Sequence, residues 1–140
     1  MAVNKQNMIL WVKGLRSNRF KQATNALAIR RNPDGEWGHC CLGVACEIAI
    51  ENGLPMKVEV IGDVEGSQAK TFGKYDDQSV LPVEVATWLG VSDRNPMLKT
   101  QGEAFHAYSA AGLNDTHGYT YEQIAQCIID TYGLEEELCQ

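Results

Sequence analysis

The residues that most directly suggest chemistry lie in the string WGHCCLG at positions 37–43. A cysteine at the start of a helix can act as a nucleophile, because the helix dipole and unpaired N–H groups lower the pKa of a thiol and stabilise an oxyanion. Such a cysteine also needs a histidine within hydrogen-bonding distance and a group that orients this histidine. The candidate catalytic set of a cysteine-dependent hydrolase or transferase is Cys41, His117 and Asp115.

The cysteines of this chain favour a different role for their thiols. The five are Cys40, Cys41, Cys46, Cys127 and Cys139, and none belongs to a CxxC pair. An odd number of cysteines without this spacing matches neither a disulfide framework nor a zinc ribbon. Reduced, buried structural thiols are therefore the favoured interpretation, and no metal or cofactor is expected. The catalytic set remains the alternative.

Basic residues near the N-terminus suggest a second kind of chemistry, the binding of an anion. Residues 19–22 read RFKQ, which places cations beside an aromatic ring, and two arginines follow at positions 30 and 31. Lys and Arg hold phosphate through charge-assisted hydrogen bonds, and an aromatic ring can stack on a base. The candidate ligand-binding residues are Phe20, Lys21, Gln22, Arg30 and Arg31. The competing interpretation is that Phe20 belongs to the core and that the charges are solvated.

Charge is distributed unevenly along the chain. Residues 1–33 carry seven basic and no acidic side chains, whereas the remaining residues carry 5 basic and 18 acidic ones, so a segment of +7 precedes one of −13 and the net charge is −6. Such an asymmetry indicates either a basic surface for an anionic partner or a basic segment paired with an acidic body. The overall acidic excess argues against general nucleic-acid binding.

Length and composition predict one soluble globular domain. The chain has 140 residues, of which 44% are hydrophobic and 21% are charged, as in ordinary globular proteins. No apolar run approaches the roughly 20 residues that span a bilayer, and the N-terminus lacks the apolar stretch of a secretory signal. We expect a domain over residues 1–133, a frayed acidic tail over 134–140, and a cytoplasmic location without membrane contact.

Hydrophobic periodicity predicts the elements that must position these residues. An amphipathic helix is expected over residues 5–16, and strands over 27–30 and 36–40 form a hairpin around an Asn-Pro-Asp-Gly turn. Residues 41–51 are apolar on nearly every side, so this helix is expected at the centre of the fold. A second hairpin is predicted from residues 57–60 and 69–72.

The second half of the chain is predicted to be mainly helical. Helices are expected over 82–89, over 103–111 and over 120–132, where Thr120 and Gln123 form a capping box; the segments 92–102 and 113–118 are expected to be loop and turn. The predicted fold class is α+β, with four or five helices around the central apolar helix at about 41–51 and two short β-hairpins.

Several short strings occur in a recognisable order. They are LRS and FKQ at positions 15–22, CCLGVxC at 40–46, LP at 81–82, WLG at 88–90, and LND at 113–115 followed by YxxIA at 121–125. In this order they resemble a family of small accessory proteins encoded by bacteriophages and prophages. The resemblance implies a protein that acts in the cytoplasm of an infected bacterium, but it carries over no catalytic residue. The connection at 116–119 departs from the family pattern, so the resemblance assigns no role to His117.

The favoured function is therefore non-enzymatic. We expect a phage accessory protein that binds and inhibits a host protein, or that sequesters a small anionic, nucleotide-like defence signal. The alternatives are the cysteine-dependent hydrolase or transferase that uses Cys41, and a minor component of the virion. The sequence leaves open whether the chain forms a homo-oligomer.

Overall fold

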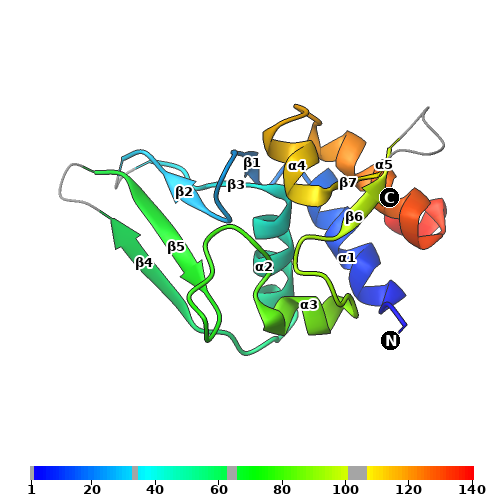
Figure 1. Ribbon diagram of the computed structural model, residues 1–140, viewed down its shortest axis with the longest axis horizontal. Helices are drawn as coiled ribbons and strands as arrows, with labels where there is room; N and C mark the ends of the chain where they lie inside the picture. Colours follow the sequence, from blue (N-terminus) through cyan, green and yellow to red (C-terminus); the bar gives the residue numbers. More distant parts are fainter. Residues whose placement is uncertain (1, 33–34, 63–65, 101–106) are drawn as a thin grey trace.

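The computed structural model describes residues 2–32, 35–62, 66–100 and 107–140. Within these residues the fold is α+β, with five α-helices, a C-terminal 3₁₀ helix and two β-sheets (Figure 1). This confirms the fold class predicted from the periodicity of the sequence. The α-helices are α1 (Lys5–Arg16), α2 (Cys41–Glu51), α3 (Val83–Leu89), α4 (Ala110–Asp115) and α5 (Tyr121–Tyr132).

Helix α2 lies at the centre of the molecule, as its apolar sequence predicts. It packs against α1, α3 and α4, and in Figure 1 it lies between the larger sheet and the other helices. Two glycines permit this close packing. A Cβ atom at Gly14 of α1 would lie 2.6 Å from Cγ1 of Ile48, and a Cβ atom at Gly43 would lie 1.7 Å from the carbonyl oxygen of Leu27.

The larger sheet has five strands in the order β1-β3-β2-β5-β4. Its strands are β1 (Lys21–Gln22), β2 (Ile29–Arg30), β3 (Gly38–His39), β4 (Val58–Gly62) and β5 (Gln68–Phe72). Both predicted hairpins are present, as β2–β3 and β4–β5, and Ile29 opposite Ala69 joins them into one sheet. Strand β1 was not predicted and pairs in parallel with β3.

A second, two-stranded sheet corrects the prediction for the segment before α4. Strands β6 (Met97–Lys99) and β7 (Ala107–Ser109) pair in antiparallel fashion where a loop and part of a helix were expected. Helix α4 begins only after Ser109, because the side chain of Ser109 accepts a hydrogen bond from the backbone N–H of Gly112. The helix continues to Asp115, so the LND string is helical rather than a turn. The remainder of the predicted helix, residues 103–106, lies outside the described residues.

The end of the chain also differs from the prediction. Helix α5 starts with the expected capping box of Thr120 and Gln123. The following residues do not form a frayed tail, since Glu136–Cys139 form a 3₁₀ helix that packs on α1. The side chains of Leu134 and Cys139 are buried. The acidic residues at 135–137 predict a frayed tail, whereas these two apolar side chains hold the segment against the domain. Among the described residues, no helix has the length and apolar character needed to cross a membrane.

Candidate functional site

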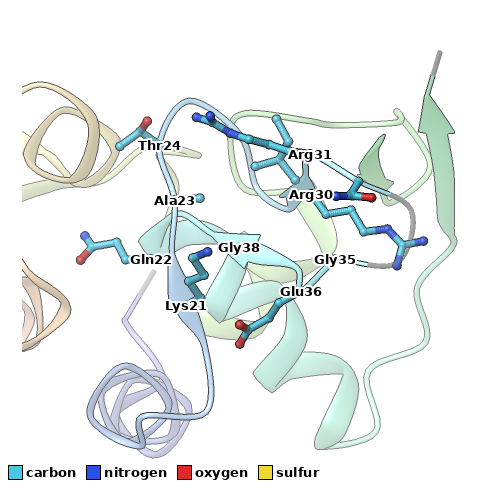
Figure 2. Close-up of a pocket in the computed structure, with 11 residues that line it drawn as sticks. Lys21, Gln22, Ala23, Thr24, Arg30, Arg31, Gly35, Glu36 and Gly38 are labelled. Atoms are coloured by element: carbon cyan, nitrogen blue, oxygen red, sulfur yellow. The ribbon is translucent and has the colours of Figure 1, made fainter. Parts of the chain in front are cut away.

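A cavity of about 560 Å³ lies between β1 and the β2–β3 hairpin (Figure 2). Residues from three strands and from the connections that follow them line it, so its walls belong to the sheet itself. Four of the five predicted ligand-binding residues are among them: Lys21, Gln22, Arg30 and Arg31. The cavity therefore brings Lys21 and Gln22 together with Arg30 and Arg31, which lie nine positions later in the sequence. Phe20, the fifth predicted residue, is not part of the described lining.

Lys21 and Arg31 are the two exposed cations of this lining. Within the described residues, neither side chain forms an ion pair or a hydrogen bond. Other cations of the basic segment are paired with the acidic body, because Arg16 contacts Glu122 and Glu136 and the Arg19 guanidinium contacts a carboxylate of α2. The two interpretations of the charge asymmetry thus apply to different residues. Among the described residues, Lys21 and Arg31 are unpaired cations that lie at the cavity, whereas the unpaired Lys5 and Lys13 lie on α1.

Arg30 has a different environment from Arg31. Its Nε donates a hydrogen bond of 2.8 Å to Oε1 of Gln68, and its guanidinium carbon lies 4.5 Å from the ring centroid of Trp37. Successive side chains of a strand point to opposite faces of the sheet. Within β2, Arg30 therefore lies on the opposite face from Ile29, although it also contributes to the cavity lining, and its guanidinium group is held by the aromatic ring.

The remaining predicted residues have mainly structural contacts. The Phe20 ring packs edge-on against His39, with 5.3 Å between the ring centroids, which supports its interpretation as a core residue. Gln22 lines the cavity, but its amide nitrogen donates hydrogen bonds to Oδ1 of Asn114 at 2.9 Å and to the carbonyl oxygen of Tyr119 at 2.8 Å. Its amide group therefore fixes β1 against α4.

Asn114 organises the polar contacts beside the cavity, and the sequence analysis missed this role. The side chain is only 2% exposed. Its Oδ1 accepts hydrogen bonds from Gln22 and from the backbone N–H of Cys41, and its Nδ2 donates to the carbonyl oxygen of Ala23 and to Asp115. Asn114 thereby caps the N-terminus of α2 from another element. In the sequence, the LND string at positions 113–115 is the feature that could have indicated this capping role, but an asparagine in such a string is also typical of an ordinary turn.

The candidate catalytic cysteine lies in an apolar environment. Cys41 is fully buried, and its Sγ donates a hydrogen bond of 3.3 Å to the carbonyl oxygen of Ala110. Burial raises the pKa of the Cys41 thiol well above its ordinary value, and it raises the pKa of Cys40 to about 11. These shifts are opposite to what a nucleophilic thiolate requires.

The other two members of the candidate catalytic set have separate contacts. The carboxylate of Asp115 accepts hydrogen bonds from the backbone N–H of Asn25 and from Asn114. The exposed imidazole of His117 packs against Tyr108, with 4.3 Å between the ring centroids. Within the described part of the chain, no hydrogen bond joins Cys41, His117 and Asp115 to one another. This geometry favours the structural interpretation of the thiols.

A partly buried charge cluster lies where β3 and β5 meet α2. Oε2 of Glu47 lies 2.8 Å from Nε2 of His39 and 3.0 Å from Nζ of Lys70. Burial alone would raise the pKa of Glu47, but the hydrogen bonds from His39 and Lys70 outweigh it and lower this pKa. The cluster joins α2 to the sheet. In the described residues, no group of three or more His, Cys, Asp or Glu side chains is arranged to hold a metal ion.

Comparison with known proteins gives one match. A family model described as a domain of unknown function, DUF8296, matches residues 3–132. A search of the curated proteins and a search of the solved structures found no match. The matched range includes α1 to α5 and both sheets, and therefore every residue that lines the cavity. Because the match covers nearly the whole chain, the protein belongs to the DUF8296 family.

Proposed function

We propose that this protein is a non-enzymatic binding protein that holds a small phosphate-bearing ligand in the cavity between β1 and the β2–β3 hairpin. The observation that carries the proposal is the presence of two unpaired cations, Lys21 and Arg31, in the lining of one cavity. The cavity volume of about 560 Å³ is in the usual range of small-molecule sites.

The electrostatics of the lining support an anion of modest size. Two exposed like charges near one cavity repel each other, and a phosphate relieves this repulsion through charge-assisted hydrogen bonds of about 1.5–3 kcal/mol each. Glu36 is the one carboxylate among the described lining residues, and it opposes the binding of an anion. The described lining carries the three cations Lys21, Arg30 and Arg31 against the one carboxylate, and this positive excess favours a ligand with more than one negative charge over a singly charged one.

The biological role in this proposal is that of a bacteriophage accessory protein. The support for it is the resemblance of the ordered sequence strings to such proteins, together with the cavity. Of the two roles expected from the sequence, the sequestration of a small anionic signal fits a cavity of ligand size better than the inhibition of a host protein does. The site of action in this proposal is the cytoplasm of the infected bacterium.

The proposal is tested by removing both unpaired cations. We expect Lys21→Gln combined with Arg31→Gln to lower the affinity for a nucleoside triphosphate by at least about 100-fold, because two charge-assisted hydrogen bonds are lost. Isothermal titration calorimetry at low ionic strength measures this change, and added salt should weaken binding to the unsubstituted protein. The melting temperature should stay nearly constant, since both side chains are exposed and unpaired.

Two further variants make this test specific. Lys5→Gln combined with Lys13→Gln removes the same charge from exposed positions of α1 and should leave the affinity nearly unchanged. Glu36→Gln should raise the affinity, because it removes the opposing carboxylate. An equal loss of affinity in the α1 variant would show that binding depends only on net charge, and it would contradict the proposal. Unchanged affinity in the Lys21 and Arg31 variant would also contradict it.

A further inference from the structure

One residue from each strand of the larger sheet contributes to a continuous row. The row runs across all five strands through Lys21, Gly38, Ile29, Ala69 and Ile61, each opposite the next. Directly paired residues of neighbouring strands lie on the same face of a sheet. At about 4.8 Å per strand, the row is about 19 Å long.

Two adjoining cavities follow this row. The cavity with the unpaired cations includes Lys21, Gly38 and Ile29 in its lining, and a second cavity of about 410 Å³ includes Ile29, Ala69 and Ile61. Ile29 belongs to both linings, so the cavities share a wall. Every member of the row lines one cavity or the other, and the pair Arg30 and Gln68 from the alternate positions of β2 and β5 also contributes to their linings.

The two ends of the row differ in chemistry. The first end carries the unpaired cations, whereas the described lining of the second cavity contains no charged side chain. At that second end Ile61 is 41% exposed, so part of this apolar residue is open to solvent beside the cavity, as are other residues of β4. Helix α2 packs on the opposite face of the sheet, because Lys70, the neighbour of Ala69 in β5, reaches Glu47 of α2.

We infer that the row is a single binding surface for a nucleoside phosphate, with the phosphates at Lys21 and Arg31 and the base lying over Ile29, Ala69 and Ile61. This inference rests on the proposed function and names the class of its ligand. A base is flat and has weakly polar faces. The small side chain of Ala69 between two isoleucines provides a shallow apolar surface on which such a base can lie. An inorganic anion held by the cations would leave this apolar surface exposed to water. The row therefore suits a ligand that carries both phosphates and a base.

The inference is tested by comparing two ligands that share a triphosphate. Adenosine triphosphate carries a base, and inorganic tripolyphosphate does not. Calorimetry without divalent cations should give roughly tenfold tighter binding for adenosine triphosphate. Ile61→Thr should lower the affinity for adenosine triphosphate by roughly three- to tenfold through lost apolar contact, and it should leave the affinity for tripolyphosphate unchanged.

A matched control lies on the same strand. Val60 is 52% exposed and points to the opposite face of β4, so Val60→Thr should change neither affinity. Threonine keeps the β-branch at both positions, so the strand should remain intact, and sedimentation should give the same mass for all three proteins.

Each other outcome overturns a defined part of the inference. Equal affinity for the two ligands, with no effect of Ile61→Thr, would limit the site to the anion pocket and would overturn the extended surface while the proposed function stands. Failure of both ligands to bind the unsubstituted protein would overturn the proposed function together with this inference. A dimer that dissociates in Ile61→Thr would show that a second copy of the chain covers the apolar end, and it would overturn the assignment of the base.

Discussion

Arg30 and Arg31 are adjacent in the chain and both line the cavity, but their guanidinium groups have different environments. The guanidinium group of Arg30 is held by Trp37 and Gln68, whereas that of Arg31 has no partner among the described residues. The sequence shows that both residues are cationic, and it predicts both as ligand-binding residues. Which of the two is paired depends on Gln68, which lies in a different hairpin. That contact between distant segments is the part of the candidate site that residue patterns do not reveal.

The buried thiols lead to a prediction at the residue scale. All five cysteines are buried, including Cys139, which the sequence analysis placed in an exposed tail. We expect a thiol reagent near neutral pH to modify the native protein only as fast as the protein unfolds, because a buried thiol with a raised pKa is inaccessible and protonated. Absorbance of the released reagent follows the reaction. An added exposed thiol, Ser92→Cys, should react at once and provides the reference rate.

The same thiols predict how stability depends on pH. The pKa of Cys40 is raised from 9.0 in its unperturbed state to about 11 in the fold. Its contribution to stability is therefore complete below pH 9.0 and is lost as the pH rises through about 11. Urea unfolding across this range should show stability falling with pH.

For the thiol-reagent experiment, rapid modification of a native thiol that disappears in Cys41→Ser would contradict structural burial and would support the enzymatic alternative.

At the scale of elements, the long helices follow from the sequence and three of the short strands do not. Helices α1 and α5 show apolar periodicity over three turns, α2 is apolar on nearly every side, and α5 adds a capping box, so local signals define them. Strands β1, β6 and β7 have only two or three residues, which is too short for an alternating pattern. Strands β2 and β3 are as short, but the Asn-Pro-Asp-Gly sequence between them indicates their hairpin. Strand β1 pairs with β3, which lies beyond β2 in the chain, and this pairing is a property of the tertiary fold.

The packing of α2 predicts different effects of alanine at two helical glycines. Gly43→Ala should destabilise the protein by more than about 3 kcal/mol, because the new methyl group would overlap the backbone of Leu27, which cannot rotate away. Gly14→Ala should cost less, since its closest contact is the side chain of Ile48, which has other rotamers, and alanine favours the helix. Urea unfolding of both variants measures the difference. Equal stability of the two variants would show that the backbone around Leu27 moves to make room for the added methyl group of α2.

At the scale of the whole molecule, the charge asymmetry of the sequence corresponds to a contact between the two ends of the chain. Arg16, at the end of α1, forms ion pairs with Glu122 of α5 and with Glu136 of the 3₁₀ helix, each at 2.9 Å. Its side chain is only 15% exposed, but those of Glu122 and Glu136 are 65% and 46% exposed, so these remain surface pairs of modest strength. The N-terminal basic segment therefore has two roles, because Arg16 and Arg19 hold the acidic body while Lys21 and Arg31 remain available to a ligand.

This contact between the ends predicts that the C-terminal residues stabilise the domain. Removal of residues 134–140 should lower the free energy of unfolding by about 2–4 kcal/mol, chiefly because the apolar side chains of Leu134 and Cys139 leave the core and uncover part of α1. Urea unfolding of the shortened chain measures this loss. Glu135→Gln combined with Glu137→Gln removes charge but keeps the apolar contacts, so it should leave the stability nearly unchanged. If the shortened chain were as stable as the full one, the tail would be the frayed segment that its acidic sequence predicts. The ion pair between Arg16 and Glu136 would then not stabilise the fold.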